Sequence, residues 1–141
     1  PLLGLGLWVG GTEELVFRGF LQTELGEIFP EWIAAGVGST LFALVHLLWE
    51  REKTLPQLPG LGLMGLILVL GRWVDGGNLG LAWGLHAGWI CGLSSLTGAE
   101  LIRYTGNLSP WITGLKGEPL AGIAGISCLL GTGAVLWGLL S

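Results

Sequence analysis

The sequence predicts an all-α protein: a polytopic transmembrane helical bundle with about five membrane helices. Hydrophobic residues make up 51% of the chain and charged residues only 11%, whereas a soluble domain usually carries about 25% charged residues. Four runs without a charged side chain, residues 32–49, 54–71, 76–99 and 119–141, contain 18, 18, 24 and 23 residues. Because a helix needs about 20 apolar residues to cross a bilayer, these runs indicate membrane helices. The runs show no alternation of polar and apolar residues, so a membrane β-barrel is not expected.

The net charge and the length of the chain narrow the possible classes of protein further. The formal net charge is −4 and only six Lys or Arg are present. This argues against a nucleic-acid partner, because nucleic-acid binding requires clustered positive charge. A chain of 141 residues is one domain at most, so we expect residues 1–141 to form a single membrane-embedded domain. Since the chain begins inside an apolar stretch without a methionine, we expect it to be a fragment of a longer protein.

The individual helices follow from the breaks in this pattern. Pro30 ends the first helix, and Trp32 anchors the second at the membrane interface. A charged loop at residues 50–53 and two prolines separate the second helix from the third, and residues 75–78 form a turn. A polar segment at residues 98–117 precedes the last helix. The predicted helices are residues 2–26, 32–49, 60–73, 79–97 and 119–140.

The basic residues predict the orientation of the bundle. If the spans alternate, the loops after the second and fourth helices share one side of the membrane. These loops hold four basic residues, against Arg72 alone near the other side, so the positive-inside rule places them in the cytoplasm. The four are Arg51, Lys53, Arg103 and Lys116.

The fourth helix has glycine at positions 80, 84, 88 and 92. A residue at every fourth position stays close to one helix face, and glycine there lets another backbone approach closely. We therefore expect tight helix packing along this face.

Titratable side chains inside the predicted helices need a physical reason, because each costs about 2.5–3.5 kcal/mol on insertion scales. Glu14 and Arg18 lie one turn apart with the glutamate on the N-terminal side, which is the favourable order for an ion pair. Glu13 points elsewhere and has no partner on its own helix. The remaining two are His46 and His86. On its own, the first group could be an ion-pair cluster that only fixes its helix in the bundle.

The depth of His46 favours a site over a packing cluster. Glu13 and His46 lie the same 16.5 residues on either side of the break between the first two helices. At a rise of about 1.5 Å per residue, both then lie about 25 Å from the turn. His86 follows the turn at Asn78 by eight residues, about 12 Å, so it is expected to lie several ångströms away from their level.

Three motifs in this order resemble those of a known family. They are Glu-Glu-x-x-x-Arg at residues 13–18, Phe-x-x-x-His at residues 42–46, and the third histidine, His86. They are similar to the motifs of the CAAX protease and bacteriocin-processing (CPBP) intramembrane protease family, and residues 18–22 and 84–89 also resemble its bacterial and plastid members. The resemblance covers residues 11–92 and implies an all-α membrane fold with a peptidase-type site.

The resemblance also implies roles for these residues. Glu13 is implied to be the general base, His46 to orient the attacking water, and His86 to hydrogen-bond the carbonyl oxygen. Many members carry a residue such as Asn one turn after the last histidine, where this chain has Ile90 and so lacks that amide. Glu14, Arg18 and Phe42 are expected to support the site.

A metalloprotease is the alternative mechanism. One glutamate and two histidines also form a catalytic zinc set, which would make Glu13, His46 and His86 metal ligands. The sequence lacks His-Glu-x-x-His, the stronger helical zinc signature. We favour the metal-free glutamate mechanism, expect no cofactor, and keep zinc as the alternative.

The sequence therefore predicts an intramembrane endopeptidase of the CAAX prenyl protease type, in contact with membrane lipids and acting on a peptide or protein, lipidated or not. The substrate itself is not readable from the sequence. Two other classes stay open: a non-catalytic membrane scaffold or bacteriocin-immunity-type protein, and a transporter with a proton relay of Glu and His. The predicted location is a bacterial plasma membrane or a plastid or ER-type membrane, with the active site near the cytoplasmic side.

Overall fold

The computed structural model describes residues 2–98 and 107–141, and every regular element in this part of the chain is helical. The predicted all-α class is thus confirmed. The elements are α1 (Leu2–Glu14), the π-helix η1 (Leu15–Leu21), α2 (Gln22–Ile28), α3 (Glu31–Val45), the 3-10 helix η2 (His46–Leu48), α4 (Arg51–Thr54), η3 (Leu55–Gln57), α5 (Leu58–Val74), α6 (Gly80–Gly98), α7 (Pro110–Thr113), η4 (Leu115–Gly117), η5 (Pro119–Ala121) and α8 (Ile123–Leu140).

The first predicted helix is one rod with an irregular middle. Helical φ and ψ angles continue from Glu14 through η1 into Gln22, so α1, η1 and α2 form a single helix that ends at Ile28. The chain then becomes extended at Phe29, and Pro30 precedes α3. The sequence predicts a charged loop at residues 50–53, but residues 51–57 form the short helical turns α4 and η3 that lead into α5, where Pro59 is tolerated in the first turn. The third helix therefore starts at Leu58.

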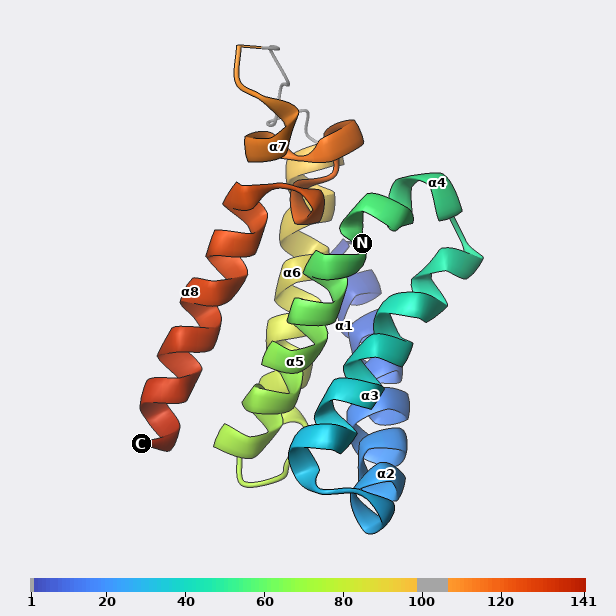
Figure 1. The fold of residues 1–141 in the computed structure, drawn as a ribbon, viewed down its shortest axis with the longest axis vertical. Coiled ribbons are helices and arrows are strands. Elements are labelled where there is room, and N and C mark those ends of the chain that lie inside the picture. The colour runs from blue at the N-terminus through green and yellow to red at the C-terminus, as the bar shows by residue number, and fades with distance from the viewer. Residues whose placement is uncertain (1, 99–106) are drawn as a thin grey trace.

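Helix α5 lies at the centre of the bundle. It packs against α3, α6 and α8, while α1 packs mainly against α6, and Figure 1 shows α8 and α3 on either side of α5. The buried apolar side chains form one cluster that draws on all of these helices except α1. Its buried members are Phe42, Ala43, Leu61, Met64, Ile67, Leu68, Ala82, Leu129 and Leu136.

Three helical stretches among the described residues are long and apolar enough to cross a membrane, namely Glu31–Leu48, Arg51–Val74 and Ile123–Leu140. The last one exposes Val135, Trp137 and Leu139, each to 66%, as a lipid-facing helix would. Of the five membrane spans predicted from the sequence, three are therefore supported among the described residues. The first helix carries acidic and basic side chains, and glycine, serine, tryptophan and a histidine dilute the apolar residues of α6. The fold is consistent with an integral membrane protein.

The close helix contact predicted from glycines falls on α1 instead of the expected face of α6. A Cβ added at Gly84, Gly88 or Gly92 would meet nothing within 4 Å, so that prediction is wrong among the described residues. By contrast, a Cβ on Gly6 would lie 2.8 Å from the Ala87 carbonyl oxygen, and one on Gly10 would lie 3.1 Å from the Ala87 amide nitrogen. The glycines that allow the approach are in the partner helix, and this approach brings α6 against the acidic end of α1.

The two loops predicted to share one side of the membrane do lie at the same end of the bundle. Lys116 Nζ donates a hydrogen bond of 3.0 Å to the Glu52 carbonyl oxygen, which joins the segment after α7 to the segment after α3. Figure 1 shows α4 and α7 at this end and the α5–α6 turn at the other. Arg103 lies outside the described residues. Arg72 is at the opposite end, as predicted, but its guanidinium is hydrogen-bonded within the bundle.

We expect the α1–α6 contact to be sensitive to a single methyl group. Gly6→Ala should lower the free energy of unfolding by about 1–3 kcal/mol, because the new Cβ would overlap backbone atoms that cannot move without separating the helices. Gly4→Ala is the matched control, since its Cβ would meet nothing within 4 Å. Reversible unfolding in detergent micelles measures both, and equal stability of the two variants would contradict the packing described here.

Candidate active site

The sequence-predicted residues come from three helices and meet beside α1. Glu13 and Glu14 end α1, Arg18 lies in η1, His46 begins the short 3-10 turn after α3, and His86 lies in the middle of α6. Each position follows from the local fold: the rod of α1 and η1 presents the acidic residues, and the α3 helix tightens at the point where His46 projects.

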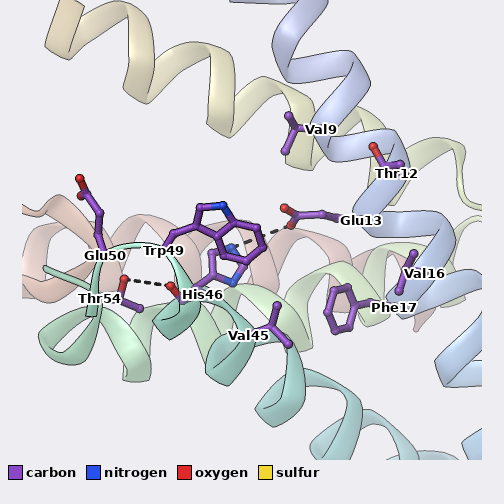
Figure 2. A pocket seen from close by; sticks show the side chains of 10 residues that line it. All are labelled: Val9, Thr12, Glu13, Val16, Phe17, Val45, His46, Trp49, Glu50 and Thr54. Atoms are coloured by element: carbon purple, nitrogen blue, oxygen red, sulfur yellow. Dashed lines mark hydrogen bonds and ion pairs between the residues drawn. The ribbon is translucent and has the colours of Figure 1, made fainter. Parts of the chain in front are cut away.

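Glu13 faces both histidines. Its Oε2 atom lies 3.6 Å from His86 Nε2 and 3.9 Å from His46 Nε2, and Figure 2 shows the carboxylate pointing across the cavity toward His46. The Glu13 and His46 side chains are 29% and 30% exposed. The predicted common level of Glu13 and His46 is confirmed, and His86 lies beside the same carboxylate oxygen. The Glu13 Oε2 atom is buried, and the described residues offer it no hydrogen-bond partner.

The expected mismatch in the depth of His86 is wrong. The depth of His86 was counted from the α5–α6 turn and that of Glu13 from the break at Pro30, but these two turns are not level because the first helix extends well past the α5–α6 turn. A Cβ on Gly19 would lie 3.3 Å from Leu79, and Arg72 reaches Thr23. The α5–α6 turn is therefore level with residues 19–23 and not with the break at Pro30, which brings His86 up to the level of Glu13.

Glu14 forms the buried part of the site. Its Oε1 atom accepts from Arg18 Nη1 at 2.9 Å, and both side chains are almost fully buried, so the predicted ion pair is confirmed. The same oxygen lies 2.8 Å from His86 Nδ1, a contact that the sequence analysis missed. Arg18 Nη2 also donates to the Gly65 carbonyl oxygen at 3.1 Å. His86 thus lies between the two glutamates, with one ring nitrogen facing each.

Phe42 connects the parts of the site. Its ring, which is fully buried, makes edge contacts with His46 and His86, with centroids 4.7 and 5.7 Å away. The Arg18 guanidinium carbon lies 4.3 Å from the centroid of the same ring, within the range of a cation–π contact. The Phe42 carbonyl oxygen is 2.7 Å from His46 Nδ1. Because a carbonyl only accepts, Nδ1 carries a proton, and in the neutral ring Nε2 is then the acceptor.

An open cavity of about 740 Å³ gives access to Glu13 and His46. Its wall is mostly apolar, and Trp49 and Glu50 stand at the end where α3 gives way to α4 (Figure 2). The lining residues are Val9, Thr12, Glu13, Val16, Phe17, Val45, His46, Trp49, Glu50 and Thr54. His86, Glu14 and Arg18 are not among them and lie behind this wall.

The positions of the acidic, histidine and cysteine side chains bear on a metal site. In residues 2–98 and 107–141, no group of three or more His, Cys, Asp or Glu side chains is arranged to hold a metal ion. Ile90, one turn after His86, is half-buried and its side chain has no hydrogen-bond donor.

The fold and the site define an all-α, membrane-type protein in which a glutamate and a histidine line an open, mostly apolar cavity, and a second, buried histidine lies beside the same glutamate. Comparison with protein families matches residues 1–91 to the Rce1-like type II CAAX prenyl endopeptidases. The chain belongs to this family. No curated protein and no solved structure matches the chain.

The two adjacent glutamates should differ sharply in their effect on stability. Glu14→Gln should cost about 3–5 kcal/mol of unfolding free energy, because it leaves the buried Arg18 cation without its counter-charge. Glu13→Gln should change stability by less than about 0.5 kcal/mol, since Glu13 is partly exposed and, among the described residues, no Lys or Arg forms an ion pair with it. Thermal unfolding of the two variants in one detergent provides the comparison; similar losses would show that both glutamates are structural.

Proposed function

We propose that this chain is the catalytic core of an intramembrane endopeptidase that hydrolyses a peptide bond with a water activated by Glu13 and His46. The observation that carries the proposal is the pair of acceptor atoms facing each other in an open cavity, Glu13 Oε2 and His46 Nε2, 3.9 Å apart. That separation is too long for a direct hydrogen bond. We propose that a water beside the pair donates one proton to each atom.

The fixed tautomer of His46 supports this role. Nδ1 donates to the Phe42 carbonyl oxygen, so Nε2 accepts and cannot compete with the water as a donor. The Thr54 hydroxyl also donates to the His46 carbonyl oxygen at 3.3 Å, which ties the turn after α3 to α4. The ring is therefore held from two sides and orients the water toward Glu13.

His86 is suited to the carbonyl oxygen. Its Nδ1 faces the Glu14 carboxylate, which is paired with Arg18 and accepts. In its doubly protonated form, the ring then presents Nε2–H toward the same space as Glu13 Oε2. A cationic donor at this position stabilises the negative charge that develops on the carbonyl oxygen, which matters more here because Ile90 supplies no amide.

The reaction balances with these groups alone. Glu13 takes a proton from the water as the water oxygen bonds to the carbonyl carbon, and the carbonyl electron pair moves to its oxygen, which accepts from His86 Nε2–H. The C–N bond then breaks, the C=O bond reforms, and Glu13 passes its proton to the departing amine. Glu14, Arg18 and Phe42 hold His86 and His46 in place and take no part in proton transfer.

The non-catalytic alternative makes a different demand on the site. A scaffold or immunity-type protein needs its polar residues packed and paired, which describes Glu14 and Arg18. Among the described residues, Glu14 Oε2 and Glu13 Oε2 are both buried without a hydrogen-bond partner, so the difference between them is the open cavity that Glu13 lines, for which a scaffold gives no reason. We therefore favour the enzyme, with peptides or proteins, lipidated or not, as substrates.

The decisive experiment uses full-length protein purified in detergent and a library of quenched fluorescent peptides, with and without a chelator. We expect cleavage that survives chelation, and Glu13→Gln should lower turnover by at least about 10²-fold with the fold intact, because a general base is worth that much. Loss of activity on chelation, restored by zinc, would support the metalloenzyme instead. No cleavage of any peptide would favour the scaffold.

The cavity is proposed to open at the cytoplasmic face, because it ends beside Glu50 and the basic residues that follow. In a chain lacking Cys91 and Cys128, Glu50→Cys should react with a membrane-impermeant thiol reagent only after intact cells are permeabilised. Glu27→Cys, an exposed position at the opposite end of the first helix, is the matched control and should react from outside. The reverse labelling pattern would put the cavity on the outer face.

A further inference from the structure

The first helix contains a π-helical segment directly after the two glutamates. In η1 the backbone hydrogen bonds span one residue more than in an α-helix, and the Gln22 N–H donates to the Phe17 carbonyl oxygen, five residues back. In an α-helix, Gln22 would donate to Arg18 instead. The segment therefore leaves the Arg18 carbonyl oxygen without its usual backbone donor. Such segments are rare and frequently lie at functional sites.

Arg72 takes the place of that donor. From the last turn of α5, its Nη1 atom donates to the Arg18 carbonyl oxygen, and its Nη2 atom donates to Thr23 Oγ1 at 3.2 Å. Thr23 Oγ1 in turn donates to the Gly19 carbonyl oxygen at 2.6 Å. The third nitrogen, Nε, donates to the Gly77 carbonyl oxygen at 3.1 Å. The guanidinium is thus fixed to its own turn on one side and to the π segment on the other.

Helix α5 consequently holds Arg18 at both ends. The Gly65 carbonyl oxygen accepts from the Arg18 side chain, and Arg72 donates to the Arg18 backbone. Residues 65 and 72 are seven apart, about two helical turns, and so lie on one face of α5. The Arg18 side chain then continues through Glu14 to His86 Nδ1. An unbroken series of contacts connects Arg72 to the histidine that faces Glu13.

From this geometry we propose that Arg72 is a positioning residue for the active site. Arg72 selects the π-helical hydrogen-bond register of η1, and thereby sets the direction of the Glu14 side chain and which ring nitrogen of His86 carries the proton. The proposal rests on the proposed peptidase function for its effect on turnover, but not for its effect on His86. Arg72 touches neither the cavity nor the reacting atoms and acts only through Arg18.

The physical basis is a competition for one carbonyl oxygen. Without Arg72, the Gln22 N–H can return to the Arg18 carbonyl and restore an α-helical ring. Each residue of an α-helix turns the chain by about 100°, so moving the register by one residue rotates the segment before η1 relative to the segment after it. Glu14 can then no longer satisfy Arg18 and His86 together. The expected defect is a misplaced site in a folded protein.

The test compares Arg72→Gln and Arg72→Lys with a control, Thr23→Ala, in the full-length protein in nanodiscs. The Thr23 variant loses one contact of Arg72 but keeps the donation to the Arg18 carbonyl. Two properties are measured per folded molecule: kcat and KM for a peptide found to be cleaved, and the ¹⁵N shifts of the His86 ring, assigned with a His86→Asn variant. The ring shifts report which nitrogen carries the proton, which a loss of stability alone does not change.

We expect Arg72→Gln to lower kcat by about 10²-fold, the effect of displacing a site by about 1 Å, with KM changed by less than about twofold. Its His86 signals should lose the pattern of an Nδ1–H bonded to a carboxylate. Arg72→Lys should be intermediate, because one ammonium cannot reproduce the guanidinium's separate contacts, and Thr23→Ala should resemble the parent protein. If Arg72→Gln does not fold, Arg72→Lys carries both measurements.

A deletion tests the register directly. Removing Phe20, an exposed residue of η1, shortens the long ring by one residue, so that Thr23 N–H meets the Arg18 carbonyl in an α-helical ring. In that background, Arg72→Gln should change the His86 signals far less than it does in the parent protein. An equal change in both backgrounds would overturn the proposed selection of the π register.

Two further outcomes separate the proposals. Unchanged His86 signals and unchanged kcat in Arg72→Gln would overturn the positioning role. The same holds if the variant only lowers the amount of folded protein and leaves both properties unchanged per folded molecule. If the parent protein cleaves no peptide, the proposed function fails, while a shift of the His86 signals in Arg72→Gln would still support the positioning role.

Discussion

The buried ion pair between Glu14 and Arg18 is the constraint on which the rest of this structure depends. Both side chains are almost fully buried, and a charge left unpaired in such a place costs several kcal/mol. The two charges tolerate burial only because side chains and a backbone carbonyl of other helices contact them. Helix α5 offers the Gly65 carbonyl oxygen, α3 offers the Phe42 ring, and α6 offers His86. Assembling the bundle and completing the polar cluster are therefore the same event.

This cluster also explains how two neighbouring residues of one type come to differ. Successive side chains on a helix point about 100° apart, so a helix that turns Glu14 toward α6 and α5 turns Glu13 toward the gap beside α3. Glu14 Oε1 is paired with a cation and a histidine, whereas Glu13 has no hydrogen bond to either and lines the open cavity; the Oε2 atoms of both glutamates are buried without a hydrogen-bond partner among the described residues. The ion pair and the histidine contact fix the Glu14 side chain, and Glu13 is left available for a ligand. In the proposed mechanism, that ligand is the attacking water.

Local sequence pattern predicted whatever depends on position within one helix or one hairpin. The pairing of Glu14 with Arg18 follows from their spacing, and the level of His46 follows from symmetry about the break at Pro30. The offset between hairpins is different, because it is decided by where α6 can approach α1, and the depth of His86 was misjudged for this reason. The glycines of α6 predicted a close approach along their own face, whereas the close approach in the structure is at Gly6 and Gly10 of α1. No residue pattern marks the π segment, since the side chain that donates to the Arg18 carbonyl oxygen is Arg72, more than fifty positions away.

The position of the site near one end of the bundle follows from the cost of its unpaired acceptor. A buried carboxylate oxygen without a donor costs about 1–3 kcal/mol or more, and that cost grows where no water can reach it. Glu13 and His46 lie where α3 tightens into a 3-10 turn and the chain passes Trp49 into the charged residues 50–53, so the cavity is open to polar surroundings. The ion-paired residues, Glu14 and Arg18, are almost fully buried and do not line this cavity. The site is therefore graded, with matched charges inside and an unmatched acceptor at the polar edge. With this order, the proposed water-activating group lies where water can reach it, while the buried charges stay paired and hold the helices together.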